Sequence, residues 1–299
     1  MKERKKIALA FQGGGSHCVF SAGVAKSMFE RSDLFDVVAL SGTSGGAVNA
    51  AVAWCELVHN PKPDVGARLK ALWDEVTANT VTELSTNVMV RALSKMSETT
   101  GVRVNPYLQP PLARDNMLKM IESHVDFTFP PNAPDLYVGA LCLNTGEAKV
   151  FKNEEVDEKS IMASCCLPDM FRAEEIGGNF YWDGMYGKNP PILEPCLDAA
   201  VKPEEIWVIA IEPIHVSEPP KRNRDIKDHK LMFMSSLSLR LSVEFLGHSR
   251  PDIKIRIIEM PHRPAVSTRL SIDSVFMNKL FDSGVEVGRD FMKKVARSR

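Results

Sequence analysis

Residues 37–51 form the stretch of this sequence that most restricts its fold. An apolar segment leads through a Gly-Thr-Ser-Gly-Gly pentad into a segment of small residues. This order predicts a buried strand, a tight turn at Ser44 and a helix. The glycines Gly42 and Gly46 leave room for a strained backbone that exposes the serine hydroxyl at the carboxyl edge of a sheet. A glycine-lined turn with a bystander serine is the alternative interpretation.

A second pattern of strand, glycine loop and helix begins the chain. Residues 7–11 are apolar, residues 12–17 read Gln-Gly-Gly-Gly-Ser-His, and residues 19–29 are helical in character. Such a loop presents backbone N–H groups beside a helix N-terminus, which suits a phosphate or the oxyanion of acyl transfer. A dinucleotide site is disfavoured, because Cys18 stands where its third glycine belongs and no acidic residue ends the second strand.

The rest of the chain alternates between helical and strand-like segments. The expected helices cover residues 45–59, 64–78, 114–124, 156–164, 192–200, 226–246 and 272–295, and the expected strands cover 136–143, 147–151, 173–176, 180–182, 206–211 and 253–259. This alternation predicts an α/β fold. We expect one domain over residues 1–299, with 80–134 as a cap or lid region, or equally as a surface insertion.

The charge balance argues against a nucleic-acid partner. The chain has 299 residues and a net charge of −1, whereas nucleic-acid-binding domains are usually basic. Basic runs at residues 2–6 and 293–299 are expected to be solvated termini that could assist at an anionic membrane surface. The sequence leaves the oligomeric state open.

The cysteines and the apolar runs indicate the cellular compartment to expect for this protein. Six cysteines are scattered without a C-x-x-C pair or zinc spacing, which predicts buried thiols in a reducing compartment. Histidines and carboxylates show no ligand spacing, so we expect no metal and no cofactor. No apolar run reaches membrane-spanning length, and residues 7–11 are too short for a signal peptide. We therefore expect a cytoplasmic protein, with peripheral membrane contact left open.

Asp183 is the carboxylate best placed for chemistry. The hairpin formed by residues 173–182 delivers it to a strand end, directly before Gly184. An Asx turn is the commoner explanation of an isolated Asp-Gly pair. The residues on either side of Asp183 help to decide between the two interpretations.

Several blocks together resemble the patatin-like phospholipase family. They are residues 12–17, residues 42–46, and Tyr-Trp-Asp-Gly-Met-Tyr-Gly-Lys-Asn-Pro-Pro at 181–191. Residues 163–171 also look like the family's segment before its catalytic aspartate. The resemblance therefore runs from about residue 7 to residue 191. The order of the blocks and their expected secondary structure both agree with the family pattern.

The resemblance implies a three-layer α/β/α sandwich with a mainly parallel central sheet. It also implies a catalytic dyad of Ser44 and Asp183 and an oxyanion loop of Gly13, Gly14 and Gly15, with Gly42, Gly46 and Gly184 supporting the motifs. The chain departs from the family at His17 and Cys18, where many members have a basic residue and glycine. It departs again at Met185, where Gly or Ala is usual.

These residues suggest a lipid acyl hydrolase. Ser44 would attack an ester carbonyl of a phospholipid, lysophospholipid or acylglycerol, and Asp183 would accept its proton. Burial would help by raising the pKa of the aspartate.

Two alternatives remain. A Ser-His-Asp esterase would need a late histidine, such as His262, His215 or His248. The other alternative is a catalytically weak lipid-binding member of the fold, which Cys18 and Met185 would favour.

Overall fold

The central strand of the sheet, β1 (Lys5–Phe11), has a parallel partner on either side. In the computed structural model these partners are β2 (Phe35–Gly42) and β7 (Glu205–Ala210). Two more strands, β3 (Asp135–Cys142) and β8 (Lys254–Glu259), extend the parallel part outward. The structure describes residues 3–77, 105–108, 110–212, 219–221, 223–262 and 264–298.

Shorter strands add an antiparallel edge to the sheet. Both β4 (Ala148–Lys152) and β6 (Asn179–Asp183) pair with β3, and β5 (Glu174–Ile176) pairs with β6. The described strands form one eight-stranded sheet in the order β5-β6-β3-β2-β1-β7-β8, with β4 on β3. In the register, Phe11 lies beside Gly42, so β1 and β2 end at the same edge and deliver the two glycine turns together.

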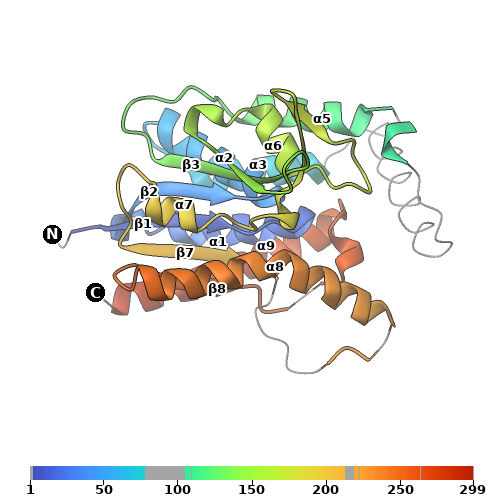
Figure 1. Ribbon diagram of the computed structural model, residues 1–299. Coiled ribbons are helices and arrows are strands. Elements are labelled where there is room, and N and C mark those ends of the chain that lie inside the picture. The colour runs from blue at the N-terminus through green and yellow to red at the C-terminus, as the bar shows by residue number, and fades with distance from the viewer. Residues whose placement is uncertain are drawn as a thin grey trace.

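Helices cover both faces of this sheet (Figure 1). The larger apolar core contains α1 (Val19–Phe29), α2 (Gly45–His59), α3 (Val65–Thr77) and α9 (Ser274–Arg297). The opposite face carries α7 (Leu193–Leu197) and α8 (Asn223–Ser249). Strand β1 joins the two cores, because Leu9 faces the first core and Ala8 and Ala10 face the second. The expected three-layer α/β/α fold with a mainly parallel sheet is confirmed.

The expected elements agree closely with the observed ones. Helices α1 and α2 have the predicted bounds. Helix α6 (Glu158–Ser164) begins two residues later than expected, because the Asp157 carboxylate accepts a hydrogen bond from Ser160 N at 2.7 Å and caps the helix. Helix α7 is shorter than the predicted 192–200, and it ends where Asp198 N donates to Glu194 O at 2.7 Å.

The expected cap region is described only in part. Residues 78–104 lie outside the described residues, so the lid remains a prediction. Beyond them, a short turn of helix, η3 (Pro106–Leu108), precedes α5 (Leu112–His124). Arg172 Nη2 donates to Tyr107 O at 2.9 Å, which ties η3 to the loop that precedes the β5–β6 hairpin.

Two further observations concern the whole described chain. All six cysteines are free thiols, as predicted, and all but the partly exposed Cys55 are buried. Across the described ranges, none of the helices combines the length and the apolar character needed to cross a bilayer.

Candidate active site

Ser44 occupies a strained turn between β2 and α2. Its backbone has φ 56° and ψ −132°, a conformation that residues other than glycine rarely adopt. A Cβ on Gly42 would lie 2.2 Å from Gly46 O, and a Cβ on Gly46 would lie 2.3 Å from Phe11 O, so both positions require glycine. The Ser44 side chain is partly exposed, whereas its neighbours are buried. The turn therefore presents this hydroxyl at the carboxyl edge of the sheet.

A buried serine on α6 accepts a hydrogen bond from the turn at Ser44. Ser44 N donates to Ser164 Oγ at 2.9 Å, and Ser164 Oγ donates to Gly139 O at 2.6 Å. The turn is thus tied both to α6 and to β3. Ser164 lies within the segment that resembles the family, but no distinct role could be predicted for it, because the bond joins residues 120 positions apart.

Asp183 lies at the end of β6 and is 1% exposed. Its Oδ1 accepts a hydrogen bond from Met185 N at 2.8 Å. Its Oδ2 is buried and has no completed hydrogen bond within the described residues. The next residue must be glycine, because a Cβ on Gly184 would lie 2.2 Å from Gly139 O. The carboxylate thus keeps one oxygen free.

The environment of Asp183 raises its pKa to about 7, mainly because burial disfavours the charged form. The Met185 N–H, the neighbouring Ser44 side chain and the positive charge of Arg269 oppose this rise. Ser44 is therefore close enough to interact with the carboxyl. The direction agrees with the expectation from sequence, and a carboxyl that titrates near neutrality can accept a proton at working pH.

The glycine loop packs directly on the serine turn. A Cβ on Gly13 would lie 2.9 Å from Ser44 Cβ, and a Cβ on Gly45 would lie 2.7 Å from Gly15 O. The Cys18 side chain packs against Gly45, since its sulfur would lie 3.0 Å from a Cβ on Gly45. Burial raises the pKa of Cys18 to about 12, so it remains a neutral thiol.

The three loop glycines are not equivalent. Gly13 N donates to Asn189 Oδ1 at 2.7 Å, so this amide is already used and the expectation that it would bind an oxyanion needs correction. Gly14 N–H lies against the weakly accepting Cys18 sulfur. Gly15, with φ +61°, is partly exposed, and its amide has no hydrogen-bond partner in the described ranges. Gly14 and Gly15 remain the candidates.

A segment near the C-terminus holds this loop in place. Ser16 N and Ser16 Oγ each donate to Arg269 O at 2.7 Å, and His17 Nε2 lies 2.8 Å from Thr268 Oγ1. The guanidinium of Arg269 forms an ion pair with Glu212. The sequence offered no sign of these contacts, because the partners are more than 250 residues apart.

Two of the three histidines considered for a triad lie away from Asp183. His248 and His262 are solvent-exposed, and neither contributes to the environment of Asp183. His215 lies outside the described residues. Among the described residues, groups of His, Cys, Asp and Glu able to hold a metal ion are absent.

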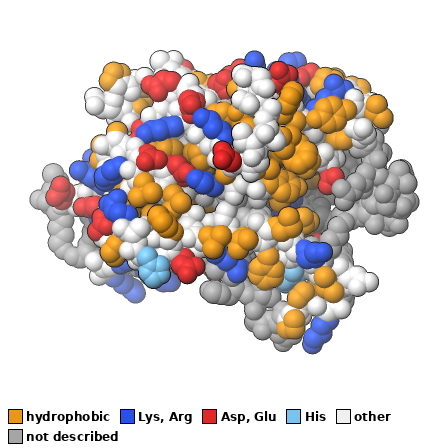
Figure 2. Space-filling view, in the orientation of Figure 1, with side chains coloured by type: hydrophobic (Ala, Val, Ile, Leu, Met, Phe, Trp, Pro, Cys, Tyr) orange, Lys and Arg blue, Asp and Glu red, His pale blue; other side chains and the backbone are white. Residues whose placement is uncertain are grey.

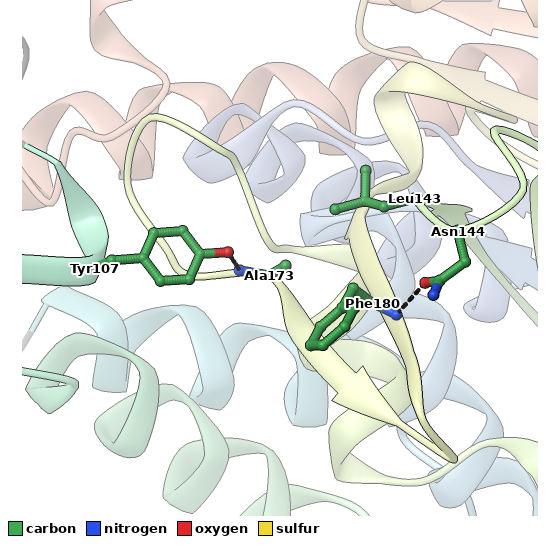
Figure 3. Close-up of a pocket in the computed structure, with 5 residues that line it drawn as sticks. All are labelled: Tyr107, Leu143, Asn144, Ala173 and Phe180. Atoms are coloured by element: carbon green, nitrogen blue, oxygen red, sulfur yellow. Dashed lines mark hydrogen bonds between the residues drawn. The ribbon is translucent and has the colours of Figure 1, made fainter.

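A surface hollow of about 390 Å³ lies on the outer side of the β5–β6 hairpin (Figure 3). It is lined by Tyr107, Leu143, Asn144, Ala173 and Phe180. Phe180 and Asp183 project from opposite faces of β6, because successive strand residues alternate. The hollow is therefore separate from Ser44 and Asp183.

Some solved structures resemble the chain only distantly. VipD from Legionella pneumophila has a TM-score of 0.44 and 10% identity over 98% of this chain and 67% of that one. A chain of the ExoU–SpcU complex of the type III secretion system of Pseudomonas aeruginosa has a TM-score of 0.44 and 14% identity over 98% of this chain. The present chain spans 52% of that protein, about half its length.

The comparison with protein families is more informative. No curated protein matches the chain. The patatin-like phospholipase model matches residues 9–195, which include the serine turn, the glycine loop and Asp183, and which form more than half of the chain. The chain therefore belongs to the patatin-like phospholipase family.

Proposed function

We propose that this protein hydrolyses carboxylic esters of lipids through a dyad of Ser44 and Asp183. The observation that carries the proposal is the state of the aspartate, which is buried beside Ser44, keeps Oδ2 free of other hydrogen bonds and has a pKa of about 7. A base with these properties can take a proton from a neighbouring hydroxyl. Catalytic hydrogen bonds are often long before substrate binds, so the free Oδ2 is compatible with this role.

The reaction would proceed in two halves. Ser44 Oγ attacks the ester carbonyl while its proton passes to Asp183, and the carbonyl oxygen becomes an oxyanion. The amides of Gly14 and Gly15 and the first turn of α2 stabilise that charge. Collapse of the intermediate releases the alcohol with the proton and leaves an acyl-serine. Water, deprotonated by Asp183, then releases the carboxylic acid and restores Ser44.

The substrate class rests on membership of the family, which supports a lipid ester. Phospholipids, lysophospholipids and acylglycerols all carry the required bond.

Hydrolysis of a chromogenic short-chain ester by the purified protein tests the proposal. Ser44→Ala should abolish turnover, whereas the matched control Ser123→Ala, at an exposed position on α5, should not change it. Turnover that survives Ser44→Ala in a folded protein would refute the serine mechanism.

A further inference from the structure

The outer face of α8 exposes a row of large apolar side chains. Their exposed fractions are 41% for Ile226, 42% for Phe233, 58% for Met234, 55% for Leu237, 57% for Leu241 and 51% for Phe245. Apart from the adjacent pair Phe233 and Met234, successive residues of the row are three, four or seven positions apart, which places them along one side of the helix. We call this row the α8 stripe.

The stripe is additional to the side of α8 that forms the core. Met232, Leu239 and Leu246 are fully buried on the opposite side of the helix. A helix that is apolar on both sides is expected to be covered on both sides. Figure 2 shows hydrophobic side chains along α8 on the exposed face of the protein. Exposed apolar patches of this kind mark surfaces that bind another molecule or a membrane.

A basic border accompanies the stripe. The Arg240 guanidinium lies 5.1 Å from the centre of the Phe233 ring. Its Nε and Nη2 atoms are buried and have no hydrogen-bond partner among the described residues. Lys230 is exposed on the same side. Cations beside apolar side chains match a surface that offers phosphate groups above a hydrocarbon layer.

A second copy of the chain fits this border less well. In a two-fold pairing residue i of one copy meets a different residue j of the other, so Lys230 and Arg240 would both have to be neutralised by the exposed carboxylates of the facing stripe. Glu244 is the acidic side chain exposed between Leu241 and Phe245. One carboxylate per chain leaves an excess of positive charge in such an interface.

A flank of α8 contacts the candidate active site. Asn189 N donates to Ser238 Oγ at 3.1 Å, and Asn189 Oδ1 accepts the hydrogen bond from Gly13 N. Only α8 would therefore separate a surface bound to the stripe from Asn189, which binds the glycine loop.

We propose that the α8 stripe docks the protein on an anionic lipid bilayer. The apolar side chains enter the headgroup layer, and the basic border formed by the exposed Lys230 and the partly buried Arg240 faces the lipid phosphates. This inference rests on the proposed function, because a lipid ester substrate is presented in a bilayer.

Vesicle sedimentation tests the surface. The probe is phosphatidylcholine vesicles with about 30 mol % phosphatidylglycerol, and every protein carries Ser44→Ala so that the lipid stays intact. Replacing Leu237 and Leu241 together by serine should lower the bound fraction at least about tenfold. Replacing Leu197 and Val201 by serine is the matched control, since these residues are 38% and 46% exposed outside α8. The control should bind as before.

A second pair of measurements separates charge from burial. Lys230→Gln and Arg240→Gln together should lower binding to the anionic vesicles to the level seen with phosphatidylcholine alone. With Ser44 restored, the Leu237 and Leu241 double variant should hydrolyse a soluble ester within about twofold of the parent, which also shows that it is folded.

The outcomes distinguish the possibilities. Equal vesicle binding by the double variant and the parent would refute the docking surface. A parent that ignores vesicles but forms dimers, which the double variant loses, would refute it in favour of a second copy. Intact vesicle binding by a protein that hydrolyses no ester would refute the proposed function and leave the docking surface supported.

Discussion

Replacing Asp183 by asparagine should remove activity and stabilise the fold at the same time. Asparagine can keep the bond from Met185 N to Oδ1, but its amide cannot accept the proton of Ser44. Loss of a general base lowers kcat by about 10²–10⁴-fold. The fold is retained, because the substitution changes one buried polar group for another of nearly the same size.

The gain in stability follows from the pKa of Asp183. In the folded protein this pKa is about 7, against an ordinary value of 3.8, so the folded state holds the proton more tightly. Ionisation of the buried carboxyl then costs the native state about 4 kcal/mol, and this cost is fully present above pH 7. Burying an unpaired asparagine amide costs about 1–3 kcal/mol. The net gain at pH 8 is therefore about 1–3 kcal/mol.

Thermal unfolding and ester hydrolysis, measured on the same samples, check the expected gain in stability and the expected loss of activity. The difference in unfolding free energy between variant and parent at pH 8 should shrink as the pH falls from 7 and vanish or reverse near pH 4. Asp282→Asn, on the exposed side of α9, is the control and should change neither quantity. An Asp183→Asn protein that keeps more than about a tenth of the parent kcat would refute the dyad. One that is less stable at pH 8 would refute the argument from burial.

Other predictions concern the groups around the dyad. The parent kcat/KM should rise about tenfold per pH unit up to about pH 7 and then level off, because Asp183 must be ionised to act as the base. In a pH profile, Arg269→Gln should move this midpoint to higher pH, since it removes a charge that lowers the pKa of Asp183; an unmoved midpoint would contradict this. His248→Ala and His262→Ala should each keep kcat/KM within about threefold of the parent, a change under about 0.7 kcal/mol, and a loss equal to that of Ser44→Ala would favour a triad. Gly15→Ala should lower kcat at least about tenfold, because its Cβ would lie 2.2 Å from Arg269 O; an unchanged kcat would show that the loop can shift freely.

Local patterns were sufficient to predict much of the fold. The bounds of α1 and α2 follow from residue spacing, and Ser44 and Asp183 were found because each lies at or just beyond the end of a strand, directly before a glycine. Strand, turn and helix are determined by neighbouring residues, so their signals survive in a single sequence.

The contacts that shape the glycine loop could not be predicted in this way. Gly13 and Asn189 are 176 residues apart, and Ser16 and Arg269 are 253 apart. A hydrogen bond between distant residues leaves no periodic pattern in either segment. This is why the use of Gly13 N by Asn189 was missed, although Asn189 itself lies within a block that resembles the family.

Covalent labelling of Ser44 is the sharpest test of the Ser44–Asp183 dyad. A fluorophosphonate ester reacts with an activated serine and stays attached, so tryptic digestion and mass spectrometry can locate it. We expect a single adduct, on Ser44, that Ser44→Ala abolishes and Asp183→Asn slows by at least about 10²-fold. An adduct on another residue, or labelling of Ser44 at the same rate in Asp183→Asn, would contradict it.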